Sequence, residues 1–139
     1  MAHALAIVIT FWAGSLWTIC GVVAPSLFAV LGDRHQAGEV AAHLFQAEAY
    51  IGLIAAVVLL ALGLLKPTRV SSKRARILIV ATALLPLISQ VGVGPLMERA
   101  RVAGDMARFG MLHGVAGGLF LLACIGALLL VWDFNRREG

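Results

Sequence analysis

The chain has few charged residues, few cysteines and no familiar catalytic motif. Asp, Glu, Lys and Arg make up 13% of its 139 residues, whereas about a quarter of the residues in a soluble domain are charged. Its two cysteines form neither a CxxC nor a CxxCH pair, which disfavours covalently attached c-type haem. P-loop, GxSxG and HExxH patterns are also absent. The sequence therefore identifies no catalytic residue and disfavours an enzyme.

Long apolar runs dominate the sequence. Hydrophobic residues make up 61% of the chain, and the mean hydropathy is +0.97. A membrane-spanning helix needs about 20 apolar residues. The runs predict four spans, at about residues 4–31, 38–65, 77–97 and 108–132, which use nearly the whole chain. We expect a single domain, 1–139, that is an all-α integral membrane four-helix bundle embedded in a lipid bilayer.

The basic residues lie in the connections between the predicted spans. The N-terminal tail, the middle connection and the C-terminal tail together hold seven Lys and Arg residues, and the other two connections hold four. By the positive-inside rule this asymmetry predicts an N-in/C-in topology. The net charge of +4 is then explained by topology, and no nucleic-acid partner is expected.

An ionisable side chain lies within the start of the fourth apolar run. The segment Gly110–Gly118 reads Gly-Met-Leu-His-Gly-Val-Ala-Gly-Gly. A histidine at membrane depth is costly, so His113 is a functional-site candidate, as a metal ligand or a haem ligand. Gly110, Gly114 and Gly118 recur every four residues and make one smooth ridge on a helix. Such a ridge favours close approach of another helix or of a flat ligand.

A polar stripe is expected along the start of the second span. Its members are spaced by four, three and four residues and share one helix face, from which Glu48 is excluded. They are Glu39, His43, Gln46 and Tyr50. Because the second and fourth spans begin on the same side of the membrane, His43 and His113 should lie at similar depth. We expect this pair to hold haem b or a soft transition-metal ion, with Glu39 as a further metal ligand.

Two further features concern the interior of the helices. Pro25 and the Gly94-Pro95 pair should kink or end the outer parts of the first and third spans, and segment 98–108 could extend the fourth span as an amphipathic helix. Cys20 lies outward of the middle of its span, whereas Cys124 lies inward of the middle of its own. These unequal depths predict two buried free thiols rather than a disulfide.

Short motifs along nearly the whole chain resemble one family. They are Phe11-Trp12-Ala13-Gly14, Ala24-Pro25 with Phe28, Ala37-Gly38-Glu39 with Phe45, Gly94-Pro95, Phe109-Gly110 and Leu112-His113-Gly114. The pattern is similar to a bacterial four-helix membrane family of unknown function, related to transmembrane-protein-205-like proteins. The resemblance implies a multi-pass protein of the bacterial inner (cytoplasmic) membrane, and the eukaryotic relatives are associated with tolerance to platinum drugs.

Three functions remain open from the sequence. In the first, the histidine pair holds a cofactor that supports porphyrin or redox chemistry. In the second, the polar stripe lines a path for a metal ion or solute through an oligomer of the chain, and the protein serves in transport or tolerance. In the third, the protein is a structural subunit that binds a second copy or another membrane protein and has no active site.

Overall fold

The computed structural model describes residues 2–65 and 69–136, and these residues form helices joined by short turns. The first helical segment comprises α1 (Ala2–Thr18), the π-helical turn η1 (Ile19–Val23) and α2 (Ala24–Val30). It is followed by α3 (Arg34–Leu65) and the short η2 (Arg69–Ser71). The third segment comprises α4 (Lys73–Ile88), the π-helical turn η3 (Ser89–Val93) and α5 (Gly94–Val102), and the fourth is α6 (Met106–Asn135).

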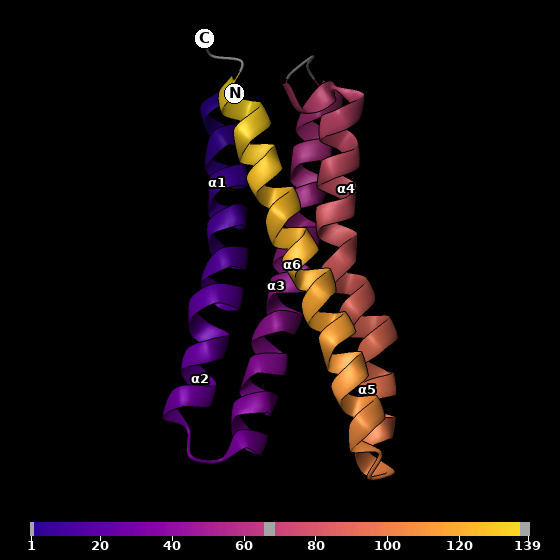
Figure 1. Cartoon of the computed structure of the whole chain (residues 1–139). Helices are drawn as coiled ribbons and strands as arrows, with labels where there is room; N and C mark the ends of the chain where they lie inside the picture. The colour runs from indigo at the N-terminus through magenta and orange to yellow at the C-terminus, as the bar shows by residue number, and fades with distance from the viewer. Residues whose placement is uncertain (1, 66–68, 137–139) are drawn as a thin grey trace.

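Four of these helical segments are long and apolar enough to cross a membrane. The expectation of an all-α chain with four such helices is confirmed. α1 packs beside α3 and α6, and α4 packs beside the same two helices, so the four segments form a bundle. α1 begins and α6 ends at the same end of the bundle (Figure 1). Lys66 and Arg137, which contribute to the predicted orientation, lie outside the described residues.

The core is a narrow strip along the inner faces of the helices. On α1 the large buried residues are Leu5, Ile9, Trp12 and Leu16, spaced four, three and four residues apart. This spacing puts them on one helix face. Most buried residues of α3 are small, including Ala49, Gly52 and Ala56, and small residues allow helices to approach closely, as is common in membranes. In each span most of the most apolar window is unburied and is available to lipid.

The first and third segments share the same irregularity. In each, a five-residue π-helical turn precedes a residue followed by proline, at Pro25 and at Pro95. The Ala24 N–H donates to the Ile19 carbonyl, and the Gly94 N–H donates to the Ser89 carbonyl. A proline cannot donate in a helix, and a widened turn is one way to accommodate it. The predicted kinks therefore take the form of π-helical turns inside continuous helices.

These two turns are part of an internal repeat that the sequence analysis missed. Ser89 begins η3 70 residues after Ile19 begins η1 (89 − 19). The same shift relates buried positions of α1 and α4, namely Leu5 to Ala75, Ile9 to Ile79, Trp12 to Thr82 and Ala13 to Ala83. Both helices run in the same direction (Figure 1), so the first and third segments are parallel copies of one pattern.

The connection between the third and fourth segments differs from the expectation. Residues 98–102 continue the third segment as α5, so segment 98–108 is not one helical extension of the fourth span. Gly104 adopts φ of 72°, a conformation that favours glycine and interrupts the helix. Asp105 then caps α6 by accepting from the Arg108 N–H at 3.0 Å. The chain turns here because a positive-φ glycine and an N-cap follow each other directly.

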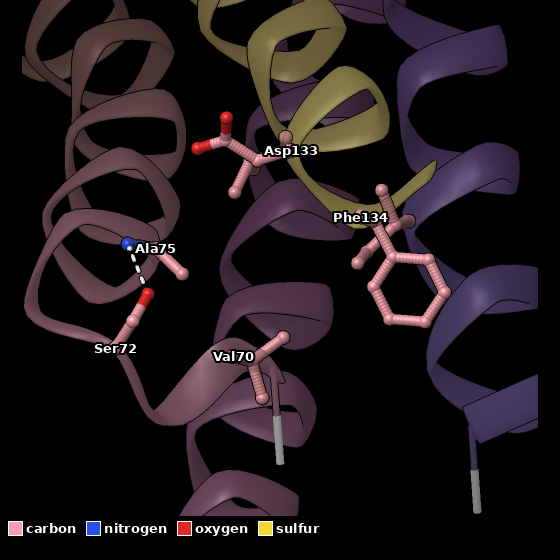
Figure 2. Close-up of a pocket in the computed structure, with 7 residues that line it drawn as sticks. Val70, Ser72, Ala75, Asp133 and Phe134 are labelled. Atoms are coloured by element: carbon pink, nitrogen blue, oxygen red, sulfur yellow. Dashed lines mark hydrogen bonds between the residues drawn. The ribbon is translucent and has the colours of Figure 1, made fainter. Parts of the chain in front are cut away.

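The end of the bundle near η2 is held by polar contacts (Figure 2). The Ser72 side chain accepts from the Ala75 N–H at 3.2 Å and caps α4. Nearby, Arg74 Nε lies 2.9 Å from Asp133 Oδ2 and joins α4 to α6. The cavity between these elements, which Val70 and Phe134 also line, measures only about 10 Å³. It is too small to hold a substrate.

We predict that Gly52→Ala destabilises the fold by about 1–3 kcal/mol, the usual cost of overpacking. A Cβ atom added at Gly52 would lie 2.9 Å from Trp12 Nε1, so the indole or α3 would have to shift. The measurement is the free energy of unfolding in detergent. The matched control is Gly117→Ala on α6, where an added Cβ meets nothing within 4 Å. Equal stability of the two variants would contradict the packing described here.

Candidate functional site

The most unusual side chain in the bundle is a buried carboxyl group. Glu48 lies near the middle of α3 and is 1% exposed. It faces α1, where the Ser15 hydroxyl lies 2.9 Å from Glu48 Oε1 and also 2.9 Å from the Trp12 carbonyl oxygen. A hydroxyl has one hydrogen to donate, so Ser15 can donate to only one of these acceptors at a time. The Glu48 carboxyl group of α3 is thus bonded to α1 by one hydroxyl, which it shares with the Trp12 carbonyl oxygen.

Two polar atoms at this helix contact have no partner among the described residues. They are Glu48 Oε2 and Trp12 Nε1. Trp12 lies against Gly52, one turn after Glu48 on α3, so both atoms belong to adjoining turns of the same interface. A buried polar group without a hydrogen bond costs about 1–3 kcal/mol. The interface therefore retains an unused acceptor and an unused donor at a substantial energetic cost.

Two thiols adjoin this carboxyl group. Cys20 in η1 packs against the core cluster that includes Cys124 of α6, and Glu48 is close enough to interact electrostatically with both thiols. On the same side of α1, Trp17 Nε1 donates to the Cys124 carbonyl at 3.1 Å. Ser15, Glu48, Cys20 and Cys124 thus form a polar cluster contributed by three helical segments, which we call the interior cluster.

The interior cluster corrects the expectation that the two cysteines lie at different depths. Both are free, as predicted, but Cys20 is only partly buried, and it packs against the core cluster that includes Cys124. The expected depths assumed straight helices that lie parallel to one another. In the structure α6 crosses obliquely past α1 (Figure 1), and a π-helical turn carries Cys20. Both features change which residues of α1 and η1 lie beside α6.

The residues of the predicted histidine site lie on the surface of the chain. His43 and His113 are exposed, as are Glu39, Gln46 and Tyr50 of the polar stripe. Within the described residues no interaction joins His43 to His113, and His113 instead stacks on Phe109 with ring centroids 6.1 Å apart. At Gly110, Gly114 and Gly118 an added Cβ would meet nothing within 4 Å. The glycine ridge is therefore open, and no helix of the chain packs on it.

Helix geometry indicates where His43 points. Phe45 contacts Phe120 of α6, with ring centroids 4.5 Å apart. His43 precedes Phe45 by two residues, which on an α-helix is a rotation of about 160° to the other side. His43 therefore faces away from this contact with α6. In the described part of the chain no group of three or more His, Cys, Asp or Glu side chains could hold a metal ion, so a cofactor at His43 and His113 would need ligands from elsewhere.

Other polar residues at this end of α3 make surface contacts. Arg101 of α5 hydrogen-bonds Glu98 at 2.6 Å and 2.9 Å, and Arg101 NH1 lies 3.1 Å from His35 Nε2. His35 Nδ1 lies 3.5 Å from Glu39 Oε1. These contacts tie the start of α3 to α5. All four side chains are exposed, so they form a solvated network rather than an enclosed site.

Sequence reasoning missed Glu48 although a signal was present. An acidic residue in the middle of a predicted span is itself a functional-site hypothesis. The regular spacing of the polar stripe pointed instead to Glu39, His43, Gln46 and Tyr50, and Glu48 lies on another face of the helix. That other face is the interior of the bundle.

The fold defines the class of the molecule: it is a helical bundle with the features of a multi-pass membrane protein. The chain belongs to a family described as a domain of unknown function, DUF4149, whose model matches residues 7–105. Neither the curated proteins nor the solved structures contain a match. Trp12, Ser15, Cys20 and Glu48 lie within the matched region, whereas His113 and Cys124 lie beyond it.

We predict that Ser15→Ala lowers the free energy of unfolding by about 1–3 kcal/mol, because it removes the one hydroxyl among the described residues that bonds the buried Glu48 carboxyl. Chemical denaturation of the purified protein in detergent measures the loss. Ser26→Ala is the matched control, since Ser26 is exposed on α2. If both variants unfold at the same denaturant concentration, the hydrogen bond between Ser15 and Glu48 does not support the fold.

Proposed function

We propose that the protein is a small proton-linked membrane transport protein and that Glu48 is the residue that binds the proton. The observation that carries this proposal is a carboxyl group 1% exposed near the middle of a membrane-spanning helix. Ionisable groups at such positions are expensive and mark ion pathways and proton relays. Neither the solute nor the stoichiometry follows from these residues.

Energetics links proton binding by Glu48 to the arrangement of the helices. A carboxylate in an apolar interior is far more costly than a neutral carboxyl group. One hydroxyl and one unpaired oxygen provide little solvation for a charge. Release of the proton therefore requires water or another polar partner to reach Glu48, which means that α1 and α3 must separate at this level.

The helix breaks of both repeats support such a movement. π-helical turns within α-helices occur frequently at functional sites, and transporters with internal repeats place their sites near interrupted helices at the repeat interface. η1 contributes Cys20 to the interior cluster, and Cys124 comes from the other half of the chain. The interior cluster thus lies where one of the breaks meets the second half.

Assembly of several copies is part of this proposal. Four spans provide little room for a path within one chain. Polar stripe residues and the glycine ridge are exposed on α3 and α6, where lipid cannot pair with polar groups and small residues favour helix packing. A second copy packed against these faces would cover both. A purely structural subunit without an active site would use the same faces but would not need Glu48.

The cofactor interpretation of His43 and His113 stays a prediction. Both imidazoles are exposed, so haem b or a soft metal ion there would be held at the surface of the bundle or between two copies. An optical spectrum and a metal analysis of the purified protein test this interpretation. Cytoplasmic termini, location in a bacterial inner membrane and the relation to transmembrane-protein-205-like proteins are likewise retained as proposals, on the charge asymmetry and motifs described above.

Proton flux into liposomes containing the protein tests the role of Glu48. We expect an imposed inside-negative potential to drive faster acidification than in empty liposomes, as measured with an enclosed pH-sensitive dye. Glu48→Gln keeps the size of the side chain but cannot exchange a proton, so its flux should fall to that of empty liposomes. Glu98→Gln makes the same change at an exposed position of α5, outside the polar stripe, and should leave the flux unchanged.

Two results would overturn the proposed function. One is wild-type flux no faster than that of empty liposomes. The other is an undiminished flux in Glu48→Gln protein that is shown to be folded and inserted.

A further inference from the structure

We propose that a groove between α1 and α3 binds a lipid-soluble amphiphile from the bilayer, with the hydrocarbon chain in the groove and an uncharged hydroxyl end beside Ser15 and Glu48. This inference rests on the proposed function, because it names the class of solute that would move with the proton. Binding of the amphiphile needs no proton flux, however, so the two proposals are tested separately.

The groove is an apolar space on the outer side of the contact between α1 and α3. It measures about 290 Å³, whereas the cavity near η2 measures about 10 Å³. Each helix contributes four lining residues, and all of them are hydrophobic. Ile7, Phe11 and Ile54 among them are exposed, so the groove is open toward the hydrocarbon of the bilayer and has room for part of a lipid chain.

The groove leads to the buried carboxyl group. α1 and α3 run in opposite directions (Figure 1), so residue numbers rise along α1 and fall along α3 from the groove toward the opposite end of the bundle. Ser15 follows the groove residue Trp12 by three positions, and Glu48 precedes the groove residue Ile51 by three. This spacing keeps residues on one helix face. Because the Ser15 hydroxyl lies 2.9 Å from Glu48 Oε1, these two residues form the next layer of the same contact.

The polar atoms at this end of the groove favour an amphiphile over a plain hydrocarbon. Glu48 Oε2 and Trp12 Nε1 have no hydrogen-bond partner among the described residues, and Trp12 itself lines the groove. The site therefore combines an apolar space with one unused acceptor and one unused donor. A hydroxyl group both donates and accepts hydrogen bonds, whereas a charged end would be costly in so apolar a setting. An alcohol with a hydrocarbon chain matches both parts of the site.

Photolabelling of the full chain in nanodiscs tests the inference, with a decanol that carries a diazirine on its chain as the probe. We expect mass spectrometry to find the label on the groove residues of α1 and α3. Unlabelled decanol should prevent this labelling, and decane at the same concentration in the bilayer should not, because decane lacks the hydroxyl that pairs with the protein.

Substitutions of Glu48 separate this inference from the proposed function. Glu48→Leu removes both carboxyl oxygens, so the half-saturating probe concentration should rise about fivefold, the effect of roughly one lost hydrogen bond. Glu48→Gln keeps a donor and an acceptor and should be labelled like the wild type, although it should carry no proton flux. Specific labelling of a wild-type protein without proton flux would support this binding site and overturn only the proposed function.

A matched pair of variants tests the groove itself. Ile54→Trp adds bulk at a groove residue that is 65% exposed, and Val57→Trp adds it at a position of α3 that is 60% exposed and does not line the groove. Labelling should fall only in Ile54→Trp. Competition by decane as strong as by decanol, label spread evenly over the lipid-facing helices, unchanged binding in Glu48→Leu, or undiminished labelling in Ile54→Trp would each overturn the inference.

Discussion

The packing of Glu48 between α1 and α3 is the constraint on which the rest of the site depends. Within a bilayer no water is at hand to pair with polar groups, so a carboxyl group must be served by the protein itself. Here one hydroxyl serves one of its oxygens. The small residues of α3 and the indole of Trp12 close the interface around it. The structure thus keeps a costly group where apolar packing alone would be more stable.

The two halves of the bundle have similar helices but differ in the side chains at their helix contacts. Trp12 faces Gly52 in the first half, and Thr82 faces Gly126 in the second. Thr82 Oγ1 has no hydrogen-bond partner in the described part of the chain. In both halves a side chain packs against a glycine of the neighbouring helix, but this side chain is a tryptophan in the first half and a threonine in the second. Glu48 occurs only in the first half, which the family model covers entirely from residue 7, so the proposed function is concentrated there.

Much of the fold could be predicted from the sequence, because apolar run length alone indicates membrane-spanning helices. Prolines also indicated the helix breaks at Pro25 and Pro95. The face of each helix that turns inward could not be predicted, since lipid-facing and core-facing residues are equally apolar in a membrane. The polar stripe was therefore placed on a functional path although it is exposed, and Glu48 was passed over. The proximity of Cys20 and Cys124 depends on how the helices cross, and the spacing of residues in the sequence does not predict this crossing.

The most direct test of the account is the accessibility of position 48 in the folded protein. Glu48→Cys in a background with Cys20→Ser and Cys124→Ser would be treated with a water-soluble maleimide in nanodiscs, beside Tyr50→Cys in the same background. Tyr50 is 53% exposed on the same helix. Glu39→Cys in the same background supplies a second exposed position on α3. The account predicts that position 48 stays unlabelled until the protein is denatured, under conditions that label Glu39→Cys. Rapid labelling of position 48 in the folded protein would contradict its burial and with it the central claim.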